Sequence, residues 1–199
     1  MLIISSLAQA DSSIVDEDLW TFGMFMPWEF TSVNQDNGER AFIFPFYGMG
    51  AYADYNNIEW SFYGQGVDFN SKSLNNYDNY AGYSYGSSLL YGFNQHTKVG
   101  TYVNKTKFIS MLKSSAYEKG TLLSYGLKIV YNPNKPKEPN EKRKFQLNYT
   151  FSLGYLDGTD VTVYETSSRF VYSKWQVSST KTYPDLSGTT FSFGLMSKF

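Results

Sequence analysis

Residues that could perform thiol chemistry or histidine-based catalysis and metal binding are scarce in this chain. It contains no Cys and one His among its 199 residues. Without thiols, neither a disulfide framework nor a thiolate metal site can form. The single His96 lies in a polar, turn-like stretch beside Gln95 and Thr97, and no nucleophilic Ser with a third polar partner surrounds it. We therefore expect a histidine in a surface turn, no catalytic, metal-binding or cofactor-binding residues, and no enzymatic activity.

Charged and amide side chains at alternate positions form a second candidate set. Each lies on the polar face of a segment whose other face is apolar: Glu29, Glu59, Gln65, Lys128, Lys144 and Gln146. If the polar faces enclose an interior, an unpaired charge there is costly. We therefore expect a charge-paired plug, with Glu59, Lys128 and Lys144 near the same end of their strands, and no open pore. The alternative is that the lysines simply reach water at that end.

Apolar residues recur at every second position through most of the chain, which is the periodicity of a β-strand. Strands are expected near 19–30, 42–52, 58–65, 83–93, 98–112, 123–131, 145–155 and 191–199. Polar turns separate them near 34–38, 54–57, 70–80 and 132–142. In the second strand the alternation predicts one shared face for Phe42, Phe44, Phe46, Gly48, Gly50 and Tyr52.

The two faces of these strands differ in composition, and the difference indicates a membrane barrel. Aromatic residues make up 19% of the chain and charged residues 18%, yet the mean hydropathy is −0.39. Trp, Phe and Tyr dominate one face, whereas Gly, Ser and Thr dominate the other. Tilted strands of about 10 residues cross a bilayer, and aromatic residues at both strand ends are typical of transmembrane barrels. We predict an all-β, antiparallel up-and-down transmembrane β-barrel with an aromatic girdle. A soluble calyx or jelly roll with its apolar face inward is the alternative.

Composition argues against several other classes of protein. A helical membrane protein would concentrate apolar residues in runs of about 20, and a disordered chain would be poor in aromatic residues. The net charge of −1 gives no electrostatic reason to expect nucleic acid as a partner.

The length favours eight strands, with ten as the alternative. Single-chain bacterial barrels have even strand numbers, and one clear strand follows residue 187. Eight strands result if 156–187 is a long outer loop, in which Val161–Tyr164 and Phe170–Val177 could form a hairpin. Ten result if Asp157 and Gly158 form a tight turn and both segments join the barrel.

The two ends of the chain resemble targeting signals. Residues 1–10, MLIISSLAQA, are short, apolar and end with small residues, as the remnant of a signal peptide would. A single barrel domain is then expected over 11–199. Residues 192–199, SFGLMSKF, resemble the β-signal of bacterial outer-membrane proteins through Gly194 and the aromatic Phe199, although Ser197 stands where that pattern has an apolar residue. The resemblance implies recognition by the barrel-assembly machinery and location in the outer membrane of a Gram-negative cell.

Two prolines lie within expected strands. Pro27 and Pro45 fall almost opposite each other if the first hairpin turns near Asp36, and each removes a ladder hydrogen bond. The simpler interpretation is a pair of bulges or kinks. The alternative is a lateral gap that admits a lipid tail, which resembles the proline-flanked gap of the lipid A palmitoyltransferase barrel. That enzyme's catalytic histidine lies near the outer surface, and His96 does not match it.

As a whole, the chain resembles the small OmpA/OmpX/OmpW-like outer-membrane barrels and, in architecture only, solitary autotransporter-like barrel domains. The resemblance implies a monomer in contact with outer-membrane lipid. A structural, adhesive or surface-interaction role is expected, with the lumen largely filled by side chains. A narrow, porin-like channel for small or apolar solutes is the alternative, and a lipid-modifying barrel enzyme is less favoured.

Overall fold

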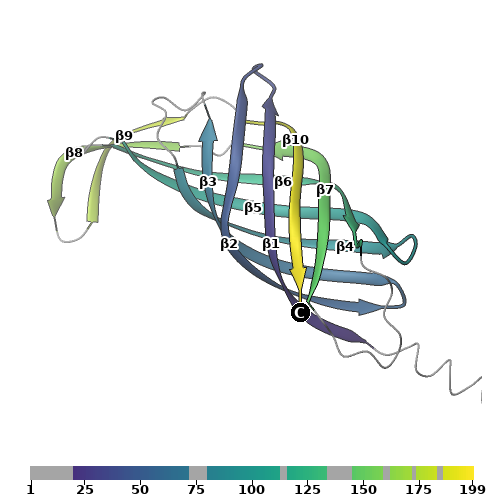
Figure 1. The fold of residues 1–199 in the computed structure, drawn as a ribbon. Helices are drawn as coiled ribbons and strands as arrows, with labels where there is room; N and C mark the ends of the chain where they lie inside the picture. Colours follow the sequence, from purple (N-terminus) through teal and green to yellow (C-terminus); the bar gives the residue numbers. More distant parts are fainter. Residues whose placement is uncertain are drawn as a thin grey trace, which may run out of the picture.

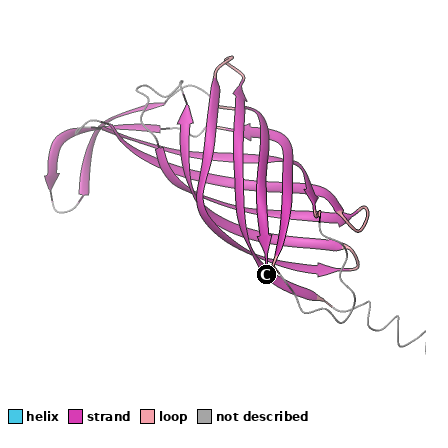
Figure 2. Cartoon of the chain, viewed as in Figure 1, coloured by secondary structure: helices cyan, strands magenta, loops and turns pink. Residues whose placement is uncertain are grey.

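The computed structural model describes residues 20–71, 80–112, 116–133, 145–158, 162–171, 174–182 and 186–199. The expected signal segment, 1–10, lies outside these ranges. Strands are the only regular secondary structure in the described ranges (Figure 2). Within them, no helix is long and apolar enough to cross a membrane.

The described residues form ten strands in succession (Figure 1). They are β1 (Thr21–Gln35), β2 (Arg40–Tyr55), β3 (Ile58–Ser71), β4 (Tyr80–Gly92), β5 (Thr97–Leu112), β6 (Ala116–Tyr131), β7 (Gln146–Asp157), β8 (Thr162–Val171), β9 (Lys174–Thr182) and β10 (Gly188–Lys198).

Eight of these strands close into an antiparallel barrel. The ladders run from β1 through β2, β3, β4, β5, β6 and β7 to β10, and β10 pairs again with β1. The predicted all-β antiparallel up-and-down barrel and the preferred number of eight strands are therefore confirmed.

The ten-strand alternative is wrong because β8 and β9 lie outside the ring. Both edges of β7 are already paired, with β6 and with β10. The β6–β7 ladder begins only at Leu123, so the first residues of β6 are free to pair with β8, through Ala116–Lys119. The β8–β9 hairpin therefore extends the β5–β6 hairpin beyond the barrel, where Figure 1 shows it projecting to the left.

The short turns follow from residues that tolerate left-handed backbone. Asn56 and Asn57 form the two-residue connection between β2 and β3 with φ of 47° and 65°, as a hairpin turn of this length requires. Gly38 has φ of 85° in the connection between β1 and β2. We call the end of the barrel with the 56–57 turn and Phe199 the terminal end, and the opposite end, with Gly38 and the β8–β9 hairpin, the hairpin end.

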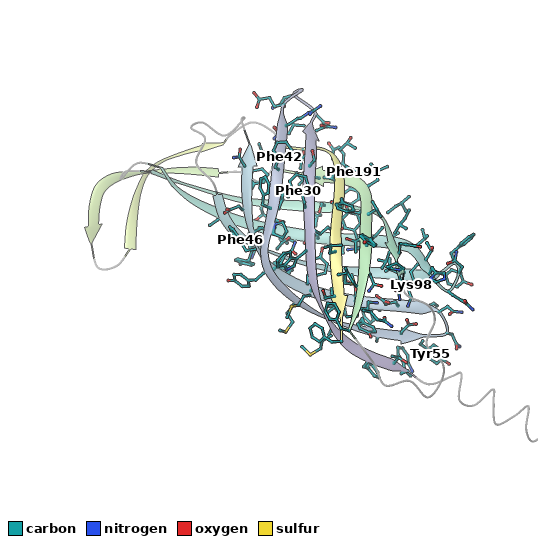
Figure 3. All side chains as sticks on the ribbon, viewed as in Figure 1. Phe30, Phe42, Phe46, Tyr55, Lys98 and Phe191 are labelled. Atoms are coloured by element: carbon teal, nitrogen blue, oxygen red, sulfur yellow. The ribbon has the colours of Figure 1, made fainter. Side chains whose placement is uncertain are left out.

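The outer wall is apolar and aromatic, and small or polar residues face inward. Figure 3 shows Phe30, Phe42, Phe46 and Phe191 on the outside of the strands. On β4, Tyr83, Tyr85, Leu89 and Tyr91 are exposed, whereas the intervening Ser84, Ser88 and Leu90 are buried. The soluble alternative, which needs the apolar face inward, does not match this arrangement.

The predicted face of β2 is correct only as far as Phe46. The β2–β3 register shifts between Pro45 and Gly48, so β2 carries one extra residue there. Because a one-residue shift moves every following side chain to the other face, Gly50 is buried on the inside and Met49 is exposed. Tyr52 accordingly packs inside the barrel, against the buried cluster of Phe25, Tyr63 and Met196.

An apolar cluster fills the interior at the hairpin end. It consists of Val33, Ala41, Ile43, Val67, Phe69, Leu122, Leu156 and Leu186, each buried. The alternation that places Glu59 inside β3 also places Val67 and Phe69 inside, so the interior of β3 changes from charged to apolar along its length. Burial of this apolar surface stabilises the barrel at that end.

Candidate functional site

A buried ion pair crosses the middle of the barrel. Glu29 of β1 and Lys128 of β6 lie on distant walls, and Lys128 Nζ is 2.8 Å from Glu29 Oε2. Ser152 of β7 donates a hydrogen bond to the other carboxylate oxygen at 3.3 Å. Because both charged groups are nearly inaccessible to solvent, each depends on the other for compensation of its charge.

Two tyrosines occupy the space around this pair. Lys128 Nζ lies 5.6 Å from the centre of the Tyr63 ring, and the hydroxyls of Tyr102 and Thr190 are 3.2 Å apart. The cavity left among these side chains has a volume of about 10 Å³. Such a space admits about one water molecule, so the middle of the barrel is filled.

A second charged cluster lies inside the terminal end. Glu59 of β3 is fully buried (0% exposed) and pairs with Lys198 of β10 and, at 2.9 Å, with Lys98 of β5. Lys98 also pairs with Asp54. Lys198 Nζ lies 4.2 Å from the centre of the Tyr52 ring, which gives this cation a second favourable contact. The cluster ties β3, β5 and β10 together across the lumen.

The predicted lysine partners differ from the observed ones. Lys128 pairs with Glu29 and not with Glu59. Lys144 lies outside the described residues. Lys98 and Lys198 supply the positive charge at the terminal end instead. Alternation in the sequence of β10 places Lys198 on the inward face, together with Ser192 and Met196. The pattern of a single strand does not show which inward side chains meet across the lumen.

The predicted amides lie at two levels. Gln65 is buried beside the central cavity, and its side-chain oxygen has no hydrogen-bond partner. Gln146 is half-buried and lines a cavity of about 270 Å³ at the terminal end. His96 lines the same cavity, and its Nδ1 is 2.9 Å from the carbonyl oxygen of Asn132. His96 is therefore a half-buried residue in a turn, where its ring contacts a backbone carbonyl group.

The predicted assembly residues both lie at the seam between β1 and β10. A Cβ added at Gly194 would lie 2.2 Å from the carbonyl oxygen of Trp28 on β1, so only glycine permits this approach of the strands. Phe199 and Met24 exchange two backbone hydrogen bonds of 3.1 and 3.3 Å, which continue the seam to the last residue. The Phe199 ring itself is exposed.

The two strand prolines border an interruption in the β1–β2 ladder. Pairing lapses between the Phe25–Gly50 pair and the Thr31–Ile43 pair. Pro27 remains paired with β10 and Pro45 with β3 on their other sides. The interruption follows from two missing donors and the extra residue in β2.

Among the described residues, no three His, Cys, Asp or Glu side chains gather as a metal site would require. The described side chains of Glu29, Glu59, Lys98, Lys128 and Lys198 form ion pairs inside the barrel. These pairs connect strands on different walls.

The solved structures similar to this chain include two outer-membrane barrels. The crystal structure of Neisserial surface protein A (NspA) aligns with a TM-score of 0.43 and 15% identity, over 92% of this chain and 100% of the other. The outer membrane protein OprG from Pseudomonas aeruginosa aligns with a TM-score of 0.42 and 15% identity, over 89% and 96% of the two chains. No family model matches the sequence, and no curated protein matches it. The assignment as a barrel therefore stands on the chain's own closed ladder.

Proposed function

We propose that this chain is a small outer-membrane barrel whose barrel is a closed membrane anchor and whose role is at the cell surface. The observation that carries the proposal is the combination of an aromatic outer wall with a filled interior. Large exposed apolar side chains cover every wall of the ring, a surface that only lipid or a partner would cover. Inside, ion pairs and the apolar cluster leave about 10 Å³ at mid-height.

The terminal end would face the periplasm and the hairpin end the outside, because transmembrane barrels have short periplasmic turns and longer outer loops. On this orientation, β8 and β9 extend the β5–β6 hairpin into an outer sheet. We assign the structural, adhesive or surface-interaction role to this outer sheet.

The test of the closed barrel is conductance in planar bilayers, with an outer-membrane porin reconstituted in parallel as the positive control. We expect no unitary current steps from the purified full chain, because the described side chains leave a cavity of only about 10 Å³ at mid-height. Steps whose size changes in Gln65→Ala would favour the narrow-channel alternative instead, since Gln65 borders the central cavity.

We also propose that the barrel-assembly machinery recognises the Phe199 ring. The ring is exposed and is not needed for the two backbone hydrogen bonds that Phe199 makes with Met24. Phe199→Ala should therefore refold in detergent as well as the unchanged chain, yet reach the outer membrane of cells poorly. Equal loss in detergent would instead make the ring part of the fold.

A further inference from the structure

An apolar groove opens on the outer wall of the barrel, at mid-length of β1, β2 and β3. Its volume is about 790 Å³. Met26 and Trp28 of β1 and Met49 of β2 line one side, and Tyr83 and Tyr85 of β4 line the other. None of the residues that line it is charged.

The floor of the groove is made by glycines. Gly64 and Gly66 of β3 lie opposite Tyr85 and Tyr83 in the β3–β4 ladder. A Cβ at Gly64 would meet nothing closer than a carbonyl oxygen at 3.9 Å, so the space above this residue is empty. Trp60 and Phe62 precede Gly64 on the outward face of β3 and carry large rings. Gly64 and Gly66 carry no side chain, which creates the depression.

The extra residue in β2 forms the remaining wall. The register shift between Pro45 and Gly48 leaves Tyr47 77% exposed beside Gly66, with a ring atom 3.3 Å from where a Cβ would be. The groove is thus a product of the bulge and the glycines together.

The groove ends at the wall of the barrel. Gln65 borders both the groove and the central cavity, but that cavity has a volume of only about 10 Å³. A molecule in the groove therefore stays on the outer wall.

We propose that this groove binds one acyl chain of a membrane lipid. The proposal rests on the proposed location in a membrane, because acyl chains are the solvent at mid-height of a spanning strand. The uncharged lining fits an uncharged occupant. Aromatic rings of β1, β2 and β4 line the depression, and the two methionines in its wall can adapt to a linear chain.

The test uses phosphatidylethanolamine vesicles that contain a lipid with a photoactivatable diazirine in mid-chain. The full chain is reconstituted and irradiated, and the labelled residues are identified by mass spectrometry. We expect label to concentrate at Met26, Tyr47 and Met49. Gly64→Phe should fill the groove without a backbone clash and reduce this label about tenfold, equivalent to a tenfold loss of affinity.

Thr101→Phe is the matched control, because it adds the same ring to an exposed position on β5. It should leave the label unchanged. Label spread evenly around the outer wall, label insensitive to Gly64→Phe, or a protein–protein crosslink at the groove in place of lipid would each overturn the acyl-chain site. Failure of the chain to float with the vesicles would instead contradict the membrane location, so the two failures are distinguishable.

Discussion

The charges of single residues such as Glu29 and Lys128 are compensated only when the barrel is closed. Glu29 and Lys128 are 99 positions apart in sequence, yet their charged atoms are 2.8 Å apart. Alternation within each strand predicted that both residues point inward. It could not predict their pairing, because that depends on which strands face each other across the lumen.

The Glu29–Lys128 pair yields a first prediction. Lys128→Met should lower the free energy of unfolding by about 3–5 kcal/mol, because it leaves Glu29 buried without a counter-charge. Urea unfolding in detergent micelles measures the change. The double variant Glu29→Gln, Lys128→Met should recover most of the loss, since no unpaired charge remains. A single variant as stable as the unchanged chain would contradict the buried pair.

The terminal-end cluster yields a second prediction. Glu59→Gln removes the carboxylate shared by Lys98 and Lys198 and leaves the more buried lysine, Lys198, without its partner. We expect a loss of several kcal/mol in the free energy of unfolding. Glu39→Gln makes the same chemical change at an exposed turn position and should change stability by less than about 0.5 kcal/mol. Equal effects of the two substitutions would rule out a structural role for the cluster.

At the scale of elements, alternation was sufficient for most strands and failed at β2. There, the extra residue between Pro45 and Gly48 reverses the faces. Two prolines in facing strands signalled an irregularity, but whether a kink keeps or reverses the alternation depends on hydrogen bonding with the neighbouring strand. The sequence therefore indicated where the bulge would lie and not which side chains it would turn inward.

The β1–β10 seam yields a third prediction. Gly194→Ala should destabilise the barrel, because the new methyl group would overlap the Trp28 carbonyl oxygen and push the closing strands apart. Thermal unfolding in detergent, followed by the heat-modifiable shift in gel migration, measures the effect. Ser197→Ala, on the same strand but only half-buried, is the control. If the two variants unfold at the same temperature, close approach of the strands at Gly194 does not determine the stability of the seam.

The β8–β9 hairpin yields a fourth prediction. Within the described residues, its strands pair only with each other and with the start of β6. Gly158 and Leu186, which flank it, are already close, with a Cβ at Gly158 placed 2.7 Å from that of Leu186. Replacing 159–185 by a short Gly-Ser linker should therefore leave folding and heat-modifiable migration intact. If the truncated chain cannot fold, the β8–β9 hairpin is required for folding of the barrel, which would contradict this prediction.

At the scale of the whole molecule, the fold explains how a chain with polar mean hydropathy can suit a membrane. The apolar residues are on the outer wall, and the interior contains Ser, Thr, Gly and paired charges, with an apolar cluster at the hairpin end. The overall architecture was predictable because one period, two residues, recurs along most of the chain. The filling of the lumen was less predictable from the sequence, because it depends on side chains from opposite walls of the barrel.

We propose that the aromatic outer face of the barrel contacts lipid, whereas its inner face is closed to water. Because the chain has no Cys, single-cysteine variants along β4 can be spin-labelled without background. Accessibility to oxygen and to an aqueous nickel reagent is then measured in vesicles at Ser84, Tyr85, Ser88 and Leu89. The account predicts high oxygen accessibility at Tyr85 and Leu89, and protection from both reagents at Ser84 and Ser88. Oxygen accessibility that does not alternate, or nickel access at the two serines, would contradict it.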